Sequence, residues 1–223
     1  MSIIQSTRIQ KRIPATQKRG PATSNRLLAA GGVVGPILFV VAFTVAGLVR
    51  PGYSPVHQAV SDLGVGPNPW ILNVTLVTLG VLLTAFVVGF HRTIGESFGV
   101  AGCWTSTALL ALPGLGFAWA GIFTEAPATL TLHWVVGMPL LALGSMGGFL
   151  VTGLLLRRLS AWKGWSTYSI VNSIVTLAIL VFMFSSWTWG FGGITERVLF
   201  IVVLAWYVAF GWRLSRQEQV GRG

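Results

Sequence analysis

Charged side chains are scarce in this chain of 223 residues, and acidic ones are the scarcest. Only 9% of the residues are charged and 5 are acidic, whereas roughly 25% are charged in an ordinary soluble domain. This composition excludes an ordinary water-soluble fold. The single cysteine, Cys103, excludes an intrachain disulfide. We interpret Cys103 as a small buried hydrophobe.

Histidine is also rare, with 3 residues in the chain. His133 lies inside an apolar run and His91 lies at the opposite end of a different one, so two axial ligands could not meet at a haem. The spacings H-x-x-x-H and H-E-x-x-H are absent from the sequence. We therefore expect no cofactor.

Apolar sequence is what the chain has in abundance, since 53% of its residues are hydrophobic. Six apolar runs follow Arg26, and each approaches the roughly 20 residues that a helix needs to cross about 30 Å of hydrocarbon. The runs lack the strict alternation of a barrel wall, so they predict helices. The predicted fold class is all-α, an integral membrane bundle of six transmembrane helices. The predicted spans are 27–49, 70–90, 98–122, 129–156, 166–187 and 194–212.

Basic residues are distributed unevenly between the two sides of these spans. If the amino terminus is inside, thirteen basic residues lie on the inner side, and only Arg50 and Arg197 lie outside, which accounts for all 15. Cytoplasmic segments carry this excess, so both termini are predicted to be cytoplasmic and the protein to be multi-pass in the cell (cytoplasmic) membrane. The predicted organisation is a basic disordered arm (1–26), a six-helix transmembrane domain (27–214) and a short tail (215–223).

The formal net charge of +10 lies mainly in the amino-terminal arm and the inner loops. A basic patch on a soluble fold would suggest nucleic acid, but here membrane lipids are the simpler partner. We expect anionic headgroups to contact the cytoplasmic face and expect no nucleic acid. The sequence does not identify a protein partner.

Glycine and proline predict how the helices pack. Gly31 and Gly35, like Gly144 and Gly148, are four residues apart, which places small residues on one helix face where a neighbour can approach closely. Pro113 and Pro139 lie inside the third and fourth spans and should kink them, because proline removes a backbone hydrogen bond.

Most ionisable side chains outside the inner loops fall on the predicted outer face. His133 lies about one turn inside the fourth span, and an ionisable group there normally faces the bundle interior with a partner. Glu125 and Glu196 are the nearest partners by depth. These residues predict an outer-face polar pocket. The candidate ligand-binding residues are Arg50, Tyr53, Ser61, Asp62, Glu125, His133, Glu196 and Arg197.

Several short motifs occur in the same outer segments. They are P-G-Y-S-P at 51–55, S-D-L at 61–63, G-I-F-T-E-A-P at 121–127, L-H at 132–133 and E-R at 196–197. In their order and spacing, the chain resembles the bacterial and archaeal membrane proteins grouped as the domain of unknown function 998 family, over roughly residues 30–212. That family looks distantly similar to the DRAM-like six-helix membrane proteins. The resemblance implies a six-helix layout and recurrent outer-face residues, but no reaction.

The hypothesis that we favour is a non-enzymatic bundle that binds a lipid or small amphipathic molecule at the outer-face pocket. Arg50 and Arg197 would hold a phosphate or carboxylate of that ligand. Proton-coupled transport through Glu125, His133 and Glu196 is less favoured, since no ionisable residue lies centrally and the two halves of the chain show no repeat.

Two alternatives remain open. One is an intramembrane metal-dependent hydrolase acting on lipid, with a metal held by some of His57, Asp62, Glu125 and His133. The other is a structural or partner-binding membrane subunit, which would have the same sequence features. Whether the protein is an enzyme is therefore undecided, with the balance against it.

Overall fold

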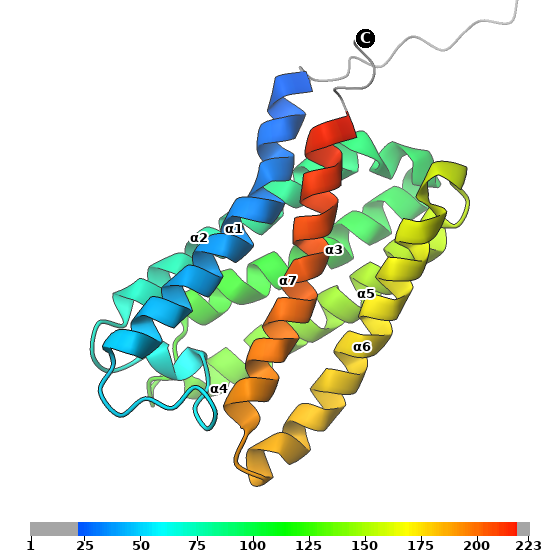
Figure 1. Cartoon of the computed structure of the whole chain (residues 1–223). Coiled ribbons are helices and arrows are strands. Elements are labelled where there is room, and N and C mark those ends of the chain that lie inside the picture. Colours follow the sequence, from blue (N-terminus) through cyan, green and yellow to red (C-terminus); the bar gives the residue numbers. More distant parts are fainter. Residues whose placement is uncertain (1–21, 218–223) are drawn as a thin grey trace, which may run out of the picture.

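The structure, a computed structural model, describes residues 22–217, which form helices joined by short loops (Figure 1). Within that range six helices are long and apolar enough to cross a membrane, so the chain is a multi-pass membrane protein. The elements are α1 (Ala22–Val49), η1 (Ser61–Gly64), α2 (Trp70–Thr93), η2 (Gly95–Phe98), α3 (Gly99–Ile122), α4 (Leu130–Leu132), η3 (His133–Gly137), α5 (Met138–Leu156), η4 (Ser160–Trp162), α6 (Lys163–Thr188) and α7 (Gly192–Gln217).

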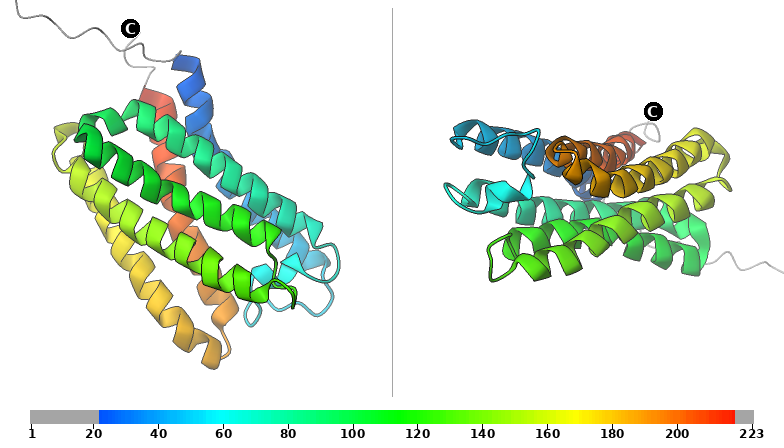
Figure 2. Two further views of the ribbon diagram at one scale, coloured as in Figure 1. Left: turned by 180° about the vertical axis from the view of Figure 1, so that it is seen from behind. Right: turned by 90° about the horizontal axis from the view of Figure 1, so that it is seen from below.

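The long helices lie in two layers, with α1, α7 and α6 in one and α2, α3 and α5 in the other (Figure 2). Helices adjacent in the chain pack side by side, and α7 packs against α1 to close the bundle. The start of α1 and the end of α7 lie at the same end (Figure 1). We call the opposite end, which carries the loops 50–69, 123–129 and 189–191, the loop end.

An aromatic cluster fills the middle of the bundle. The Trp206 ring stacks on Phe149 and Phe210, with centroids 4.6 and 4.1 Å away. Its indole nitrogen donates to the Ser169 hydroxyl at 2.9 Å, and the buried Tyr207 hydroxyl donates to the Leu110 carbonyl oxygen at 2.8 Å. Packing and satisfied polar groups hold helices together in lipid, because lipid tails are as apolar as the side chains themselves.

The two glycine pairs lie at close contacts between helices, as predicted. A Cβ atom on Gly31 would strike the Leu82 backbone of α2, and one on Gly35 would lie 3.2 Å from Leu82 Cβ. On α5, a Cβ on Gly144 would overlap the Pro113 ring of α3. The prediction of small-residue packing faces is therefore confirmed.

Helices α1 and α7 extend past the predicted boundaries of the arm and the tail. Residues 22–26, assigned to the arm, begin α1, and residues 215–217, assigned to the tail, end α7. Hydropathy detects only the part of a helix that crosses hydrocarbon, whereas backbone hydrogen bonding continues into the headgroup region. Residues 1–21 and 218–223 lie outside the described residues.

The fourth span is not a continuous α-helix. The structure has a π-helical turn, His133–Gly137, immediately before Pro139. Proline lacks a backbone N–H, and its ring crowds the carbonyl four residues earlier, so the chain widens there instead of continuing in α geometry. This turn carries His133 and Trp134, both of which line cavities at the loop end.

Replacement of Gly144 by alanine should destabilise the bundle by about 1–3 kcal/mol, because the new methyl group would overlap Pro113. Gly147→Ala is the matched control, since its nearest neighbouring atom would lie 3.5 Å away, an ordinary van der Waals contact. Thermal unfolding in detergent would measure both. Equal unfolding midpoints for the two variants would contradict this account of the α3–α5 contact.

Candidate functional site

Loop 50–69 is fastened to α7 by Arg197. Nη1 of this residue donates to the carbonyl oxygens of Pro55 at 2.9 Å, Gln58 at 3.0 Å and Gly193 at 2.8 Å. Nη2 donates to the Tyr53 hydroxyl. A guanidinium presents several donors in a fixed fork, so one side chain can serve all these acceptors at once.

Arg50 and Tyr53 brace the same loop from its beginning. Arg50 Nη1 donates to the carbonyl oxygens of Asp62 and Val65, the latter at 3.0 Å. The Tyr53 hydroxyl donates to the Ala59 carbonyl oxygen at 2.7 Å. Burial raises the pKa of the Tyr53 hydroxyl, which keeps it protonated as a donor. Nη1 of Arg50 and both terminal nitrogens of Arg197 therefore donate to this chain's own groups, most of them in the loop.

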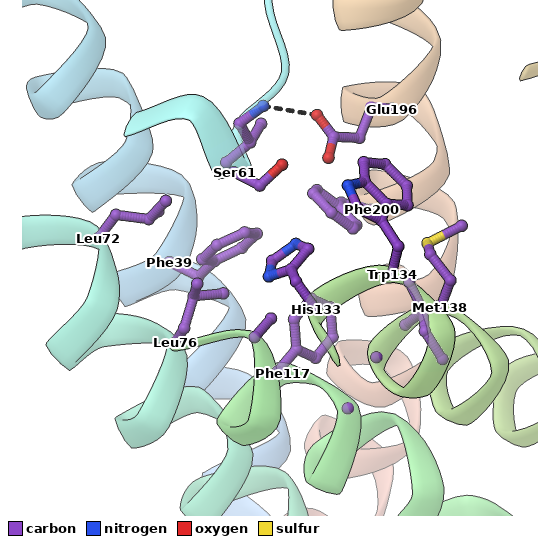
Figure 3. Close-up of a pocket in the computed structure, with 15 residues that line it drawn as sticks. Phe39, Ser61, Leu72, Leu76, Phe117, His133, Trp134, Met138, Glu196 and Phe200 are labelled. Atoms are coloured by element: carbon purple, nitrogen blue, oxygen red, sulfur yellow. Dashed lines mark hydrogen bonds between the residues drawn. The ribbon is translucent and has the colours of Figure 1, made fainter. Parts of the chain in front are cut away.

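Glu196 joins the loop to α7 a second time. Its Oε2 atom accepts a hydrogen bond from the Val60 backbone N–H at 2.5 Å (Figure 3). Gly193, one turn earlier, allows the loop backbone to approach, because a Cβ there would strike the Gln58 carbonyl. Together these contacts seat the loop over the end of the bundle.

A polar cluster lies beneath the seated loop. Glu125 Oε1 accepts a hydrogen bond from the Ser61 hydroxyl at 2.9 Å, and His133 Nε2 lies 3.8 Å from the same oxygen. His133 Nδ1 pairs with the Phe123 carbonyl oxygen at 2.7 Å. The Asp62 carboxylate accepts from the Ala59 N–H at 2.8 Å. The structure therefore brings Ser61, Glu125 and His133 together, as the sequence suggested for the last two.

The Glu125 carboxyl does not have an ordinary acidity. Burial raises its pKa to about 7, and the neighbouring Asp62 adds to the rise, while hydrogen bonds from Ser61 and Trp134 oppose it. At neutral pH this group therefore exists in both protonation states.

A small cavity of about 50 Å³ lies among Ser61, His133 and Glu196 on one side and apolar rings on the other (Figure 3). The rings are those of Phe39, Phe117 and Phe200. A cavity of this size holds a few water molecules, since one water needs roughly 10–15 Å³ measured in this way. It is too small for a lipid headgroup.

Two larger cavities together form what we call the lateral groove. One, of about 360 Å³, is lined by Ala59, Asp62, Glu125, Trp134, Met183, Phe184 and Trp187. The other, of about 490 Å³, lies between α5 and α6 and is lined almost wholly by apolar side chains. The two share Trp134, Met183 and Phe184. Helices α5 and α6 diverge toward the loop end in Figures 1 and 2, which accommodates this groove.

Sequence reasoning missed the α6 side of the groove. Met183, Phe184 and Trp187 are apolar residues within a span, so nothing in the pattern separates them from ordinary lipid-facing positions. Trp134 lies near the start of the fourth predicted span, where an interfacial tryptophan is common, so its position gives no signal for the groove either.

The structure also places the residues of the alternative metal site. Asp62, Glu125 and His133 lie in one region, whereas His57 Nδ1 pairs with the Gly190 carbonyl oxygen. Among residues 22–217, no group of three or more His, Cys, Asp or Glu side chains is arranged to hold a metal ion.

Comparison with known proteins identifies a family. A family model described as "Protein of unknown function (DUF998)" matches residues 33–213, most of the chain. No curated protein matches the chain, and no solved structure does.

Replacement of Arg197 by lysine should free the loop, because one ammonium cannot reach the acceptors that the guanidinium serves. Amide hydrogen exchange over residues 53–60 should become about tenfold faster or more, the result of losing one charged hydrogen bond of roughly 1.5–3 kcal/mol. Arg216→Lys, an exposed arginine at the other end, is the control. Unchanged exchange in the Arg197 variant would contradict the fastening role.

Stability should fall as the pH rises, because of Glu125. Its pKa is raised from 4.5 to about 7, so the folded state holds this proton more tightly than the unfolded state. The resulting stabilisation is complete below the unfolded pKa and is lost as the pH rises through the folded pKa. Glu125→Gln should remove this dependence, worth about 2 kcal/mol after solvent screening. Thermal unfolding at about pH 5 and about pH 8 tests this; identical pH profiles for the variant and the parent would contradict it.

Proposed function

We propose that this chain, which belongs to the DUF998 family and spans the membrane with six helices, binds a lipid or small amphipathic molecule in the lateral groove. The uneven distribution of the basic residues supports an orientation in which the loop end lies on the outer side of the cytoplasmic membrane. The basic end would then contact anionic headgroups on the cytoplasmic side. The ligand would then lie in the outer leaflet.

The observation that carries this proposal is the amphipathic lining of the lateral groove. At the loop end it meets the carboxyl groups of Asp62 and Glu125, and between α5 and α6 it meets Ala142, Leu177 and Leu180. Its two cavities have volumes of about 360 and 490 Å³, and ligand pockets are usually roughly 300–1,000 Å³. A molecule with a polar head and an apolar tail matches both ends.

The position of the groove supports access from the membrane. Phe184 and Val181, which line its apolar part, are 75% and 63% exposed on the surface that faces lipid. A tail could therefore enter sideways from the leaflet while its head stays at the level of the loop end. No passage through the bundle interior is needed.

The contacts support binding more than hydrolysis. In a serine hydrolase the histidine lies between the serine and the acid, but here Ser61 donates directly to Glu125. His133 Nδ1 is paired with a backbone carbonyl. The metal-dependent alternative is also less favoured, because His57 pairs with the Gly190 carbonyl oxygen and lies apart from Asp62, Glu125 and His133.

The test is to fill the groove and measure what the purified protein retains. Ala142→Trp places a large ring in the apolar part of the groove. Leu143→Trp is the matched control, because Leu143 is the next residue on α5, is 59% exposed and does not line the groove. Native mass spectrometry after mild detergent extraction would show any bound amphiphile.

We expect the parent chain and Leu143→Trp to retain an amphiphile and Ala142→Trp to lose most of it, at least about tenfold, since a filled pocket leaves no room for the tail. A parent chain that carries no amphiphile under any extraction condition would leave the partner-binding subunit as the better interpretation. Equal retention by both variants would place the ligand elsewhere.

A further inference from the structure

We propose that the lateral groove selects amphiphiles whose head carries a positive charge, an ammonium or quaternary ammonium group, and rejects those whose head is only anionic. This inference rests on the proposed function, because it names the ligand class of the same groove. It reverses the expectation from sequence, in which arginines were to hold a phosphate or carboxylate.

We call the cavity of about 360 Å³ at the loop end of the lateral groove the head cavity. The ionisable groups that line it are all acidic. They are Asp62 from loop 50–69 and Glu125 from loop 123–129, and no basic residue is among the lining. Two basic residues, Arg50 and Arg197, lie at the loop end. Both donate to backbone carbonyls of loop 50–69, and neither lines any of the three cavities. An anion placed here would meet two carboxyl groups, whereas a cation would be paired with them.

Three of the other side chains that line the head cavity are aromatic, beside Ala59 and Met183. Trp134 comes from η3, and Phe184 and Trp187 come from α6. Aromatic faces attract cations through the ring quadrupole, and the attraction strengthens when the cation leaves water. Cavities that combine aromatic walls with carboxylates are suited to quaternary ammonium groups, which have no N–H to donate. This lining supplies the second, independent reason to assign a cationic head.

The apolar part of the groove suits an alkyl tail of no fixed shape. Three methionines line it, Met138, Met146 and Met183. Methionine is unbranched and adapts to irregular partners. The selectivity is therefore placed in the head cavity and not in the tail.

The ionisation of Glu125 couples this binding to pH. The groups that face its carboxyl are Ser61 and Asp62 from the loop, His133 and Trp134 from η3, and Glu196 from α7. With a pKa of about 7, Glu125 must lose its proton to pair with an ammonium. One competing proton predicts an affinity about tenfold higher at about pH 8 than at about pH 6.

The experiment compares three amphiphiles of equal chain length on the purified full chain in a nonionic detergent. They are a lysophosphatidylcholine, a lysophosphatidylglycerol and an alkyltrimethylammonium. The first and third share the quaternary ammonium, and the first and second share the phosphate. Competition measured by native mass spectrometry should rank both ammonium amphiphiles about tenfold or more above the phosphatidylglycerol form.

Variants assign the preference to residues. Glu125→Gln should reduce ammonium binding about tenfold and abolish its pH dependence, and it should strengthen the weak phosphatidylglycerol binding, because it removes a carboxylate that repels the anionic head. Glu96→Gln makes the same chemical change on η2, at the opposite end of the bundle, and should behave as the parent. Trp187→Leu should lower ammonium binding and Trp187→Phe should restore part of it, which keeps the test valid should Glu125→Gln fold poorly.

The outcomes separate this inference from the proposed function. Equal binding of all three amphiphiles, or tighter binding of the phosphatidylglycerol form, would overturn the cationic head while leaving an amphiphile-binding groove. If none of the three binds, and the parent chain retains no lipid, the proposed function itself fails. Preference for the alkyltrimethylammonium alone would place the natural ligand outside the phospholipids and still support the inference.

Discussion

The backbone of loop 50–69 is the constraint on which the loop end depends. A loop packed against a membrane bundle presents carbonyl oxygens that need donors, because burying them unpaired is costly. Arg197 supplies donors to Pro55 and Gln58, and Arg50 supplies donors to Asp62 and Val65. The loop is therefore fixed to α7 and over α2, and its side chains acquire defined positions. Without these arginines, loop 50–69 would not be held in one position over the polar cluster.

The candidate site depends on the fixed position of loop 50–69. Ser61 is held where its hydroxyl reaches Glu125, which comes from the loop between α3 and α4. The π-helical turn forced ahead of Pro139 supplies His133 and Trp134 to the same region. Three segments distant in sequence therefore build one site, while α6 closes it from the side. The geometry depends on backbone irregularities at the loop end, and the regular helices below serve as its support.

The sequence predicted the parts of this structure that depend on composition and periodicity. Apolar runs located the six spans, and the glycine pairs located the close approaches of α1 to α2 and of α3 to α5. Ionisable residues near the predicted outer ends located the polar cluster around Glu125 and His133. What could not be predicted was which partner each side chain takes. A guanidinium donates to a carbonyl oxygen as readily as to a phosphate, so the sequence alone could not distinguish an anion-binding Arg197 from one that holds the loop.

The low acid content of the chain gives the final step of the argument. Of 5 acidic residues, Asp62, Glu125 and Glu196 gather at the loop end. Since both nearby arginines donate to backbone carbonyls, the carboxyl groups of the groove have no full counterion among its lining residues. Burial makes such a charge costly, and a carboxyl responds either by keeping its proton or by pairing with a cation. The raised pKa of Glu125 is the first response. Pairing with a cationic head in the head cavity would be the second response. It would explain why a membrane bundle with so few charged residues keeps these carboxyl groups together.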